Sequence, residues 1–245
     1  MNKSTNNKDS GIAVQEVAYS QQGKQTNWRQ SRWLVLGELL VVVLIFVADE
    51  QHLIPFSKTP FLLLFGWIAL RIRKINWRSI GLTRYRNWTS TLVGGVGAGL
   101  LLSAFQLFIS QPLLVWLLKK QPDLDDFRML TGDLKLTLIF LVLAWTLAAF
   151  GEEMVFRGYL MNRVADLFSH TRHVWIISLI VVHVGFGFAH SYQGVTGIID
   201  EGLAGLLLGL IYLRTGRNLA IPIIAHGITD SIDFALIFLG KYPGM

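Results

Sequence analysis

The feature that most constrains this chain is a series of apolar stretches that recurs from residue 33 almost to the carboxyl terminus. A helix needs about 20 mostly apolar residues to cross a ~30 Å hydrocarbon layer, and in hydrocarbon only helices and closed barrels satisfy every backbone polar group. The composition agrees, because 52% of the residues are hydrophobic and 16% are charged, against roughly 25% charged in an average soluble domain. The sequence therefore predicts an all-α, polytopic membrane protein and excludes a water-soluble globule.

Seven spans fit this pattern best, and six to eight are compatible with it. We place them at residues 33–48, 55–70, 91–118, 136–156, 174–190, 195–213 and 219–239. Residues 1–32 are polar and without periodicity, so we expect a disordered tail there, followed by one membrane domain over 33–245. A cleaved signal peptide is not expected, because the apolar stretch begins too late in the chain.

The basic residues indicate how the chain is oriented in the membrane. The net charge is +6, but the 22 lysines and arginines are spread over the loops and form no single patch that would suit nucleic acid. With seven spans, most of them fall on the side of the amino terminus, which the positive-inside rule places in the cytoplasm. We therefore expect an integral protein of the plasma membrane, with its amino terminus in the cytoplasm and no nucleic-acid partner. The absence of cysteine excludes disulfides and a cysteine nucleophile.

Two glutamates and an arginine interrupt the fourth apolar stretch. Residues four apart share a helix face, so Glu153 and Arg157 can form an ion pair. Glu152 points about 100° away from Glu153 and is left without a basic partner. A structural ion cluster at the membrane edge would use the same residues, but one arginine does not neutralise two glutamates. Because ionisable groups at membrane depth mark functional sites, we predict that Glu152 faces a partner on another helix.

Two later spans carry histidines that can reach this stretch. His190 closes one span before a polar turn, where a structural role is an alternative, and His226 is followed four residues later by Asp230. A carboxylate at that spacing can orient an imidazole or stabilise its charge. If the helix of Glu152 continues unbroken to the turn before the next span, Glu152 and His190 both lie ~24 to 26 Å from that turn. His226 lies only ~12 Å from the turn that precedes its own span. Glu152 and His190 can then meet, and His226 joins them if the first hairpin projects beyond the bilayer.

Other unusual residues in the spans have simpler explanations. Two series of glycines are spaced for close helix packing. The third span contains Gly94, Gly95, Gly97 and Gly99, and the sixth contains Gly202, Gly205 and Gly209. Pro112 should kink the third span. Further ionisable residues are given secondary or structural roles, since the sequence names no partner for them: His183, Asp200, Glu201 and Asp233.

Three motifs occur in order: Glu-Glu-x-x-x-Arg from Glu152 to Arg157, Phe-x-x-x-His from Phe186 to His190, and His-x-x-x-Asp from His226 to Asp230. Over roughly residues 135–240 the chain resembles the CPBP (Abi) family of intramembrane proteases, which includes the type II CAAX prenyl endopeptidases. The resemblance implies a membrane endopeptidase with a catalytic set of Glu152, Glu153, Arg157, His190, His226 and Asp230.

In that set, the first glutamate and the middle histidine, Glu152 and His190, would activate a water, and His226 with Asp230 would stabilise the oxyanion. The eukaryotic CAAX enzymes have asparagine where this chain has Asp230, and an ionised aspartate cannot donate to an oxyanion. Asp230 would therefore be protonated or would hold His226 as an imidazolium.

Whether a metal takes part stays open at this point. Glu152, His190 and His226 form a His₂Glu set of the kind that binds catalytic zinc, with a fourth position for water. A divalent metal such as zinc is thus a possible cofactor, and the family is usually described as metalloproteases. The chain has no His-Glu-x-x-His spacing, and we favour catalysis without a metal.

These observations predict a hydrolase that cleaves a peptide bond in a membrane-anchored or lipidated peptide or protein, as in CAAX processing. A membrane protein of the same family that serves in peptide-antibiotic processing or self-immunity is an alternative. A proton-coupled transporter is another, because intramembrane ionisable residues also form proton paths; no inverted repeat of broken helices supports it. A membrane scaffold without catalysis is the last.

Overall fold

The computed structural model describes residues 28–83, 87–168 and 170–245, and all regular elements in these ranges are helical. The predicted disordered tail lies outside them for residues 1–27. Residues 28–30, also assigned to that tail, instead form a short 3-10 helix, η1 (Trp28–Gln30), directly before the first long helix. The all-α class predicted from the sequence is confirmed.

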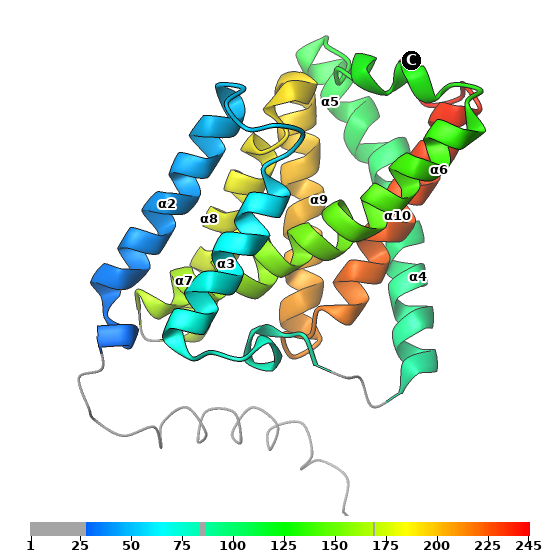
Figure 1. Cartoon of the computed structure of the whole chain (residues 1–245). Helices are drawn as coiled ribbons and strands as arrows, with labels where there is room; N and C mark the ends of the chain where they lie inside the picture. The colour runs from blue at the N-terminus through cyan, green and yellow to red at the C-terminus, as the bar shows by residue number, and fades with distance from the viewer. Residues whose placement is uncertain (1–27, 84–86, 169) are drawn as a thin grey trace, which may run out of the picture.

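Helices are found at all seven predicted positions (Figure 1). They are α2 (Arg32–Glu50), α3 (Thr59–Arg73), α4 (Trp88–Phe105) with η3 (Gln106–Ser110) and α5 (Gln111–Leu118), α6 (Leu134–Leu143) with η5 (Ala144–Leu160) and α7 (Met161–Asp166), α8 (Arg172–Phe188), α9 (Gly194–Arg214) and α10 (Ala220–Phe238). Three short 3-10 helices lie in the connections: η2 (Trp77–Ile80), η4 (Asp125–Leu130) and η6 (Ser191–Gln193).

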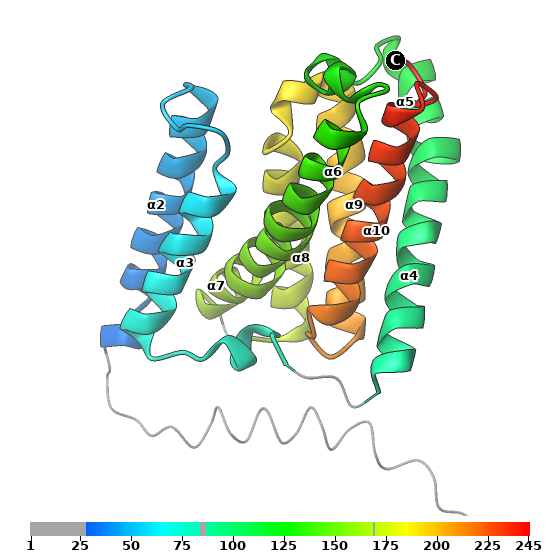
Figure 2. The same ribbon diagram turned by 45° about the vertical axis from the view of Figure 1, so that its right-hand side comes forward.

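Four helical segments in the described residues are long and apolar enough to cross a membrane. They are Trp88–Leu118, Leu134–Asp166, Ser191–Arg214 and Ala220–Phe238. The apolar helix α8 is shorter, and α2 and α3 run alongside the others as a hairpin at one side of the bundle (Figure 2). The chain is therefore a polytopic membrane protein, and the number of seven spans stays a prediction.

The helix that carries the glutamate pair is longer than predicted. It runs without a break over Leu134–Asp166, ten residues past the predicted end at residue 156, and crosses the bundle diagonally (Figure 1). Its middle part, η5, is wound as a π-helix. π-Helical turns are rare and frequently lie at functional sites. Gly158 does not interrupt the helix, which is the condition for Glu152 and His190 to lie at one depth.

The second π-helical turn, η3, joins α4 to α5. Here the backbone N–H of Gln111 donates to the carbonyl of Gln106, and Pro112 follows as a residue that has no N–H to donate. The ladder of helical hydrogen bonds is thus interrupted at the predicted position of the kink. The interruption brings two glutamines, Gln106 and Gln111, into the buried interior of the bundle.

Some of the glycines permit close contact between helices. A Cβ atom on Gly95 would lie 2.6 Å from the Cβ of Ile224, and one on Gly99 would lie 2.6 Å from the carbonyl oxygen of Ala225. Helix α10 therefore packs directly on α4. By contrast, a Cβ on Gly97 would meet nothing within 4 Å, so the packing explanation does not extend to every glycine of this series.

The sixth span shows the same distinction between its glycines. A Cβ on Gly205 would lie 2.7 Å from the ring of Phe186, and one on Gly209 would overlap the ring of His183. The predicted packing role thus holds for these two residues, and it lets α8 lie close against α9. Gly202 has ordinary spacing, since its added Cβ would lie 3.5 Å from the nearest atom.

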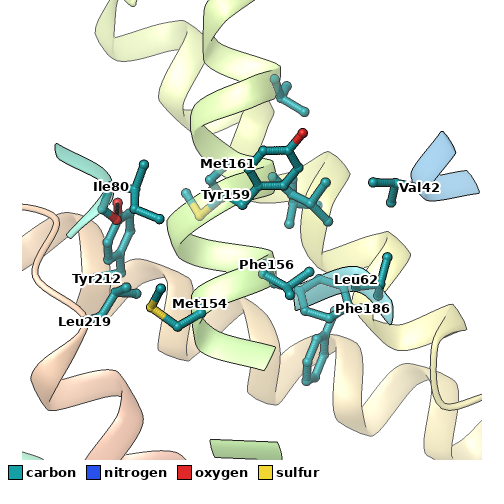
Figure 3. Packing of buried hydrophobic residues seen from close by; sticks show 14 of the residues in the cluster. Val42, Leu62, Ile80, Met154, Phe156, Tyr159, Met161, Phe186, Tyr212 and Leu219 are labelled. Atoms are coloured by element: carbon teal, nitrogen blue, oxygen red, sulfur yellow. Dashed lines mark hydrogen bonds between the residues drawn. The ribbon is translucent and has the colours of Figure 1, made fainter. Parts of the chain in front are cut away.

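A core of buried apolar residues surrounds the π-helical segment (Figure 3). Phe156 and Phe186 lie in its centre with ring centroids 4.8 Å apart, and Leu62 of α3 packs beside them. Tyr212 and Leu219 close the core on the side of Ile80 (Figure 3). This core fixes η5 against α3 and α8, and so fixes the depth and rotation of the glutamate pair.

Candidate active site

The centre of the site is a buried carboxylate shared by two cationic side chains. Glu153 and Arg157 form the predicted ion pair, with 2.7 Å between Oε1 and Nη1 and no solvent exposure of either side chain. The same Oε1 atom lies 2.9 Å from Nδ1 of His226, which comes from α10. The first and third motifs therefore meet directly, and the histidine contacts the second glutamate of the pair.

Arg157 is fixed by contacts to two further helices. Its Nη2 donates to the carbonyl oxygen of Gly205 in α9 at 2.9 Å, and its guanidinium lies 4.7 Å from the ring centroid of Phe186 in α8. A cation over an aromatic face is stabilised by the ring quadrupole, most strongly where water is absent. Arg157 thus ties η5, α8 and α9 together around Glu153.

His190 follows the end of α8 and is oriented by a backbone contact. Its Nδ1 lies 2.9 Å from the carbonyl oxygen of Phe186, so Nδ1 carries the hydrogen and donates it. In the neutral ring, Nε2 is then an acceptor on the opposite edge. The Phe186 ring lies between the two histidines, with centroids 4.8 Å from His190 and 6.4 Å from His226.

Glu152 is the carboxylate of the pair that forms no ion pair with a basic residue in the described part of the chain. It is half-buried, and its Oε2 is buried without a hydrogen-bond partner in the described residues. Its charge acts on the rings of both His190 and His226. Glu152 is therefore close enough to both histidines for its charge to act on them, and its role in the site stays a prediction.

Asp230 flanks His226 from the next turn of α10. Its Oδ1 lies 3.6 Å from Nε2 of His226, and its Oδ2 is buried without a partner in the described part of the chain. The imidazole is thus contacted by Glu153 on one nitrogen and approached by Asp230 on the other. Two carboxylates beside one imidazole favour the protonated ring, in which both nitrogens donate.

The geometry does not fit the zinc-like ligand set that the sequence leaves open. Within residues 28–83, 87–168 and 170–245, no three His, Cys, Asp or Glu side chains are grouped closely enough to hold a metal ion. Glu152, His190 and His226 are near one another but do not converge as ligands. His226 moreover uses Nδ1 on Glu153. We therefore derive no step through a metal.

One functional residue was not singled out as such from the sequence. Phe186 is fully buried and contacts Arg157, His190 and His226, so it sets the spacing of the site. Its position four residues before His190 on one helical face is the signal that indicates this contact. Glu201 of α9 is also close enough for its charge to act on Arg157 and His226.

The remaining ionisable residues lie outside this set of contacts. His183 is buried, with Nδ1 against the carbonyl of Leu179, and packs on Gly209, so it fills space between α8 and α9. Asp200 belongs to a different polar cluster, formed with α5 and η3. Asp233 is half-buried on α10.

The site thus belongs to a helical membrane protein with an intramembrane cluster of carboxylates, histidines and an arginine. Residues 134–232 match the profile of a family described as Type II CAAX prenyl endopeptidase Rce1-like. This segment contains all six predicted site residues. The resemblance to the CPBP family is confirmed over this segment, which is similar to the Rce1-like family.

A curated relative is similar over a comparable length of chain. It is the Bacillus subtilis (strain 168) protein described as Uncharacterized protein YpbD, which is 37% identical over 95 residues. The match covers 39% of this chain, and the chain spans 42% of the length of that relative. No solved structure matches this chain.

Proposed function

We propose that this protein is an intramembrane endopeptidase that hydrolyses a peptide bond of a lipidated or membrane-anchored peptide. The observation that carries the proposal is Glu152, whose Oε2 is buried without a hydrogen-bond partner in the described residues and whose charge acts on two histidine rings. A buried carboxylate oxygen without a partner costs free energy, and ionisable residues kept at membrane depth despite that cost mark functional sites. The match of residues 134–232 to a family of prenyl endopeptidases supports the same reaction.

Glu152 serves as the general base in this proposal. It takes a proton from a water molecule, and the resulting hydroxide attacks the carbonyl carbon of the scissile peptide bond. His190 positions the same water through Nε2, because Nδ1 is occupied by the Phe186 carbonyl. Glu152 then returns the proton to the leaving amine, and the amide C–N bond breaks.

His226 stabilises the negative charge that develops on the carbonyl oxygen. Its Nδ1–H donates to Glu153, so only the imidazolium form has an Nε2–H for the oxyanion. Glu153 and Asp230 favour that form by their charge. In this way Asp230 acts through His226 and need not donate to the oxyanion itself. One such donor contributes roughly 3 kcal/mol to catalysis.

Glu153 and Arg157 are positioning residues in this proposal. Both side chains are completely buried, and both act on the site through His226 and Phe186. Arg157 neutralises Glu153, which fixes the orientation of the His226 ring. Loss of either side chain changes the geometry of the oxyanion site without removing the base.

A peptide with a prenylated cysteine near its carboxyl terminus is the substrate that we propose. The printed description of the matched family supports this class. The bilayer presents such a lipid-anchored peptide to a site at membrane depth, and it would hold the peptide beside the bundle. We also propose that the protein lies in a plasma membrane with its amino terminus in the cytoplasm.

The test is cleavage of membrane-anchored reporter peptides by the purified protein in lipid vesicles, with prenylated and unprenylated forms compared. Glu152→Gln keeps the shape of the side chain and removes the base, and we expect it to lower cleavage by at least about a hundredfold. Asp126→Asn is the control, because Asp126 is exposed in η4 and lies outside the site. It should cleave like the wild type.

Each result has a defined meaning. Cleavage that Glu152→Gln removes and that a strong chelator leaves unchanged supports a glutamate-activated water without metal. Loss of wild-type cleavage in chelator would contradict the metal-free reaction proposed here. Equal cleavage by wild type and Glu152→Gln, or none by either, would contradict the protease assignment and favour an immunity, transport or scaffold role.

A further inference from the structure

A second buried polar cluster lies between α9 and the interrupted helix α4–η3–α5. Asp200 is its centre: its Oδ2 accepts hydrogen bonds from Nε2 of Gln106 at 3.2 Å and from Nε2 of Gln111 at 3.0 Å. The Gln111 amide also donates to the hydroxyl of Tyr242 at 2.8 Å. All four side chains are at least nine-tenths buried. The cluster joins parts of the chain that are about 90 or more residues apart.

The cluster contains buried oxygens without a hydrogen-bond partner among the described residues. Oδ1 of Asp200, Oε1 of Gln106 and Oγ of Ser110 are buried and have no hydrogen-bond partner in the described residues. Ser110 lies beside the Asp200 carboxylate. The Oγ of Ser103, one helical turn before Gln106, is buried without a partner as well. Unpaired buried oxygens are rare in native structures, and each one needs an explanation.

The charge of the cluster is also unbalanced. In the described ranges no lysine, arginine or histidine forms an ion pair with Asp200. The neighbouring carboxylates of Glu201 and Asp233 add to its negative field. Burial raises the pKa of the Tyr242 phenol above its ordinary value, so this hydroxyl stays neutral. The Asp200 carboxylate therefore lacks a positively charged partner among the described residues.

We propose that Asp200, Gln106 and Ser110 bind a monovalent alkali cation, with Na⁺ as the ion of suitable chemistry. Carboxylate, amide and hydroxyl oxygens are the ligands that hard cations prefer. A single carboxylate balances one positive charge, whereas the divalent sites of proteins use more carboxylates or retained waters. A proton on Asp200 would satisfy one further oxygen, but a cation can satisfy several of them at once.

The interrupted helix gives a structural reason for the site to lie here. In membrane proteins, cations are held where a helix is broken and backbone or side-chain oxygens are released from the regular ladder. Both Gln106 and Ser110 belong to the π-helical turn η3, and Pro112 prevents the regular pattern from resuming at once. The site lies toward the end of the bundle where the carboxyl terminus is found (Figure 1).

This site is separate from the Glu153–His226 site. Asp200 and Gly205 are both in α9, but Asp200 contacts η3 and α5 whereas Gly205 receives the hydrogen bond of Arg157. No hydrogen bond among the described residues joins the two sets. Cation binding at this site therefore does not depend on proteolysis, and we expect it to stabilise the folded protein with or without substrate.

The experiment is thermal unfolding of the full chain in detergent, in NaCl, KCl or choline chloride at equal ionic strength. Choline is too large for the site and keeps screening constant. We expect saturating Na⁺ to raise the apparent melting temperature by about 5 °C over choline, as a ligand bound only to the folded state does. Binding of radioactive sodium to the purified protein gives a direct second measurement.

Two variants and a control identify the ligands. Asp200→Asn keeps the shape and removes the charge, so the difference between Na⁺ and choline should disappear. Ser110→Ala removes one oxygen with little change in packing. We expect it to raise about tenfold the sodium concentration that gives half of the maximal shift in melting temperature, and a tenfold change corresponds to about 1.4 kcal/mol. Asp126→Asn removes an exposed carboxylate from η4 and should leave the Na⁺ effect unchanged.

The outcomes separate the possible occupants. A sodium or potassium effect that is lost in Asp200→Asn supports the proposal. Equal melting temperatures of the wild type in Na⁺, K⁺ and choline would overturn it. A sodium effect that persists in Asp200→Asn, or stabilisation by Ca²⁺ alone, would also overturn it. If the melting temperature instead depended on pH alone, and Asp200→Asn abolished that dependence, the site would hold a proton and the proposal would again be wrong.

Discussion

Two of the buried carboxylates in the described residues, Glu153 and Asp200, have different surroundings. Glu153 is matched by Arg157 and His226 at hydrogen-bonding distance, whereas Asp200 is surrounded by amides and hydroxyls. The first site thus has internal charge compensation, and the second has polar contacts without compensation. In a low-dielectric interior, a carboxylate that is paired with cationic side chains, such as Glu153, is held in place by them. A carboxylate without such a partner, such as Asp200, is the one that we propose binds a cation.

The comparison also separates structural from chemical residues within the first site. Glu153 is completely buried and pairs with Arg157 and His226 through Oε1, whereas Glu152, next to it in the chain, forms no ion pair with any described residue. Adjacent residues on a helix face different directions, so one glutamate can support the site and the other can act on a water. The same chemical group therefore serves two purposes within one turn.

The largest effect on stability is expected for Arg157→Met. The substitution preserves much of the volume but leaves Glu153 buried with His226 as its one remaining cationic partner, and breaking a buried ion pair in this way costs about 3–5 kcal/mol. Thermal unfolding in detergent measures the loss. Arg128→Met is the matched control, because the Arg128–Asp125 pair is exposed and should contribute less than about 1 kcal/mol. Equal effects of the two substitutions would show that Glu153 does not depend on Arg157.

A smaller effect is expected for Gln111→Leu, which removes the hydrogen bonds to Asp200 and Tyr242. Leaving these buried acceptors without that donor costs about 1–3 kcal/mol. The measurement is thermal unfolding in choline chloride, where no alkali cation contributes. Combination with Asp200→Asn should be non-additive because the residues are in contact, whereas Arg157→Met with Asp200→Asn should be additive. Additivity in the first pair would contradict the cluster.

The smallest effect is expected for Tyr242→Phe. The ring remains buried, and one neutral hydrogen bond from Gln111 is lost while that amide keeps Asp200. The expected cost is about 0.5–1.5 kcal/mol, again by thermal unfolding in choline chloride. A loss as large as that of Arg157→Met would mean that the carboxyl-terminal segment, and not the charge pair, holds the bundle together.

Residues close in sequence were placed correctly from the sequence because helix geometry alone fixes them. The pairing of Glu153 with Arg157 follows from a spacing of four. Phe186 and His190 have the same spacing and also lie close together, but this contact was not predicted. Apolar length predicted the helical positions, because hydrocarbon allows few alternatives. The three motifs also identified the segment that the family profile matches.

Contacts between distant residues were decided by the tertiary structure. The sequence placed His226 near the glutamate pair without choosing between the two, and packing of α10 on α4 and η5 brings it to Glu153. The partners of Asp200 come from another helix, through a π-helical turn that no spacing rule anticipates. A sequence pattern fixes the face of one helix, but the rotation and depth of two helices relative to each other depend on every side chain between them.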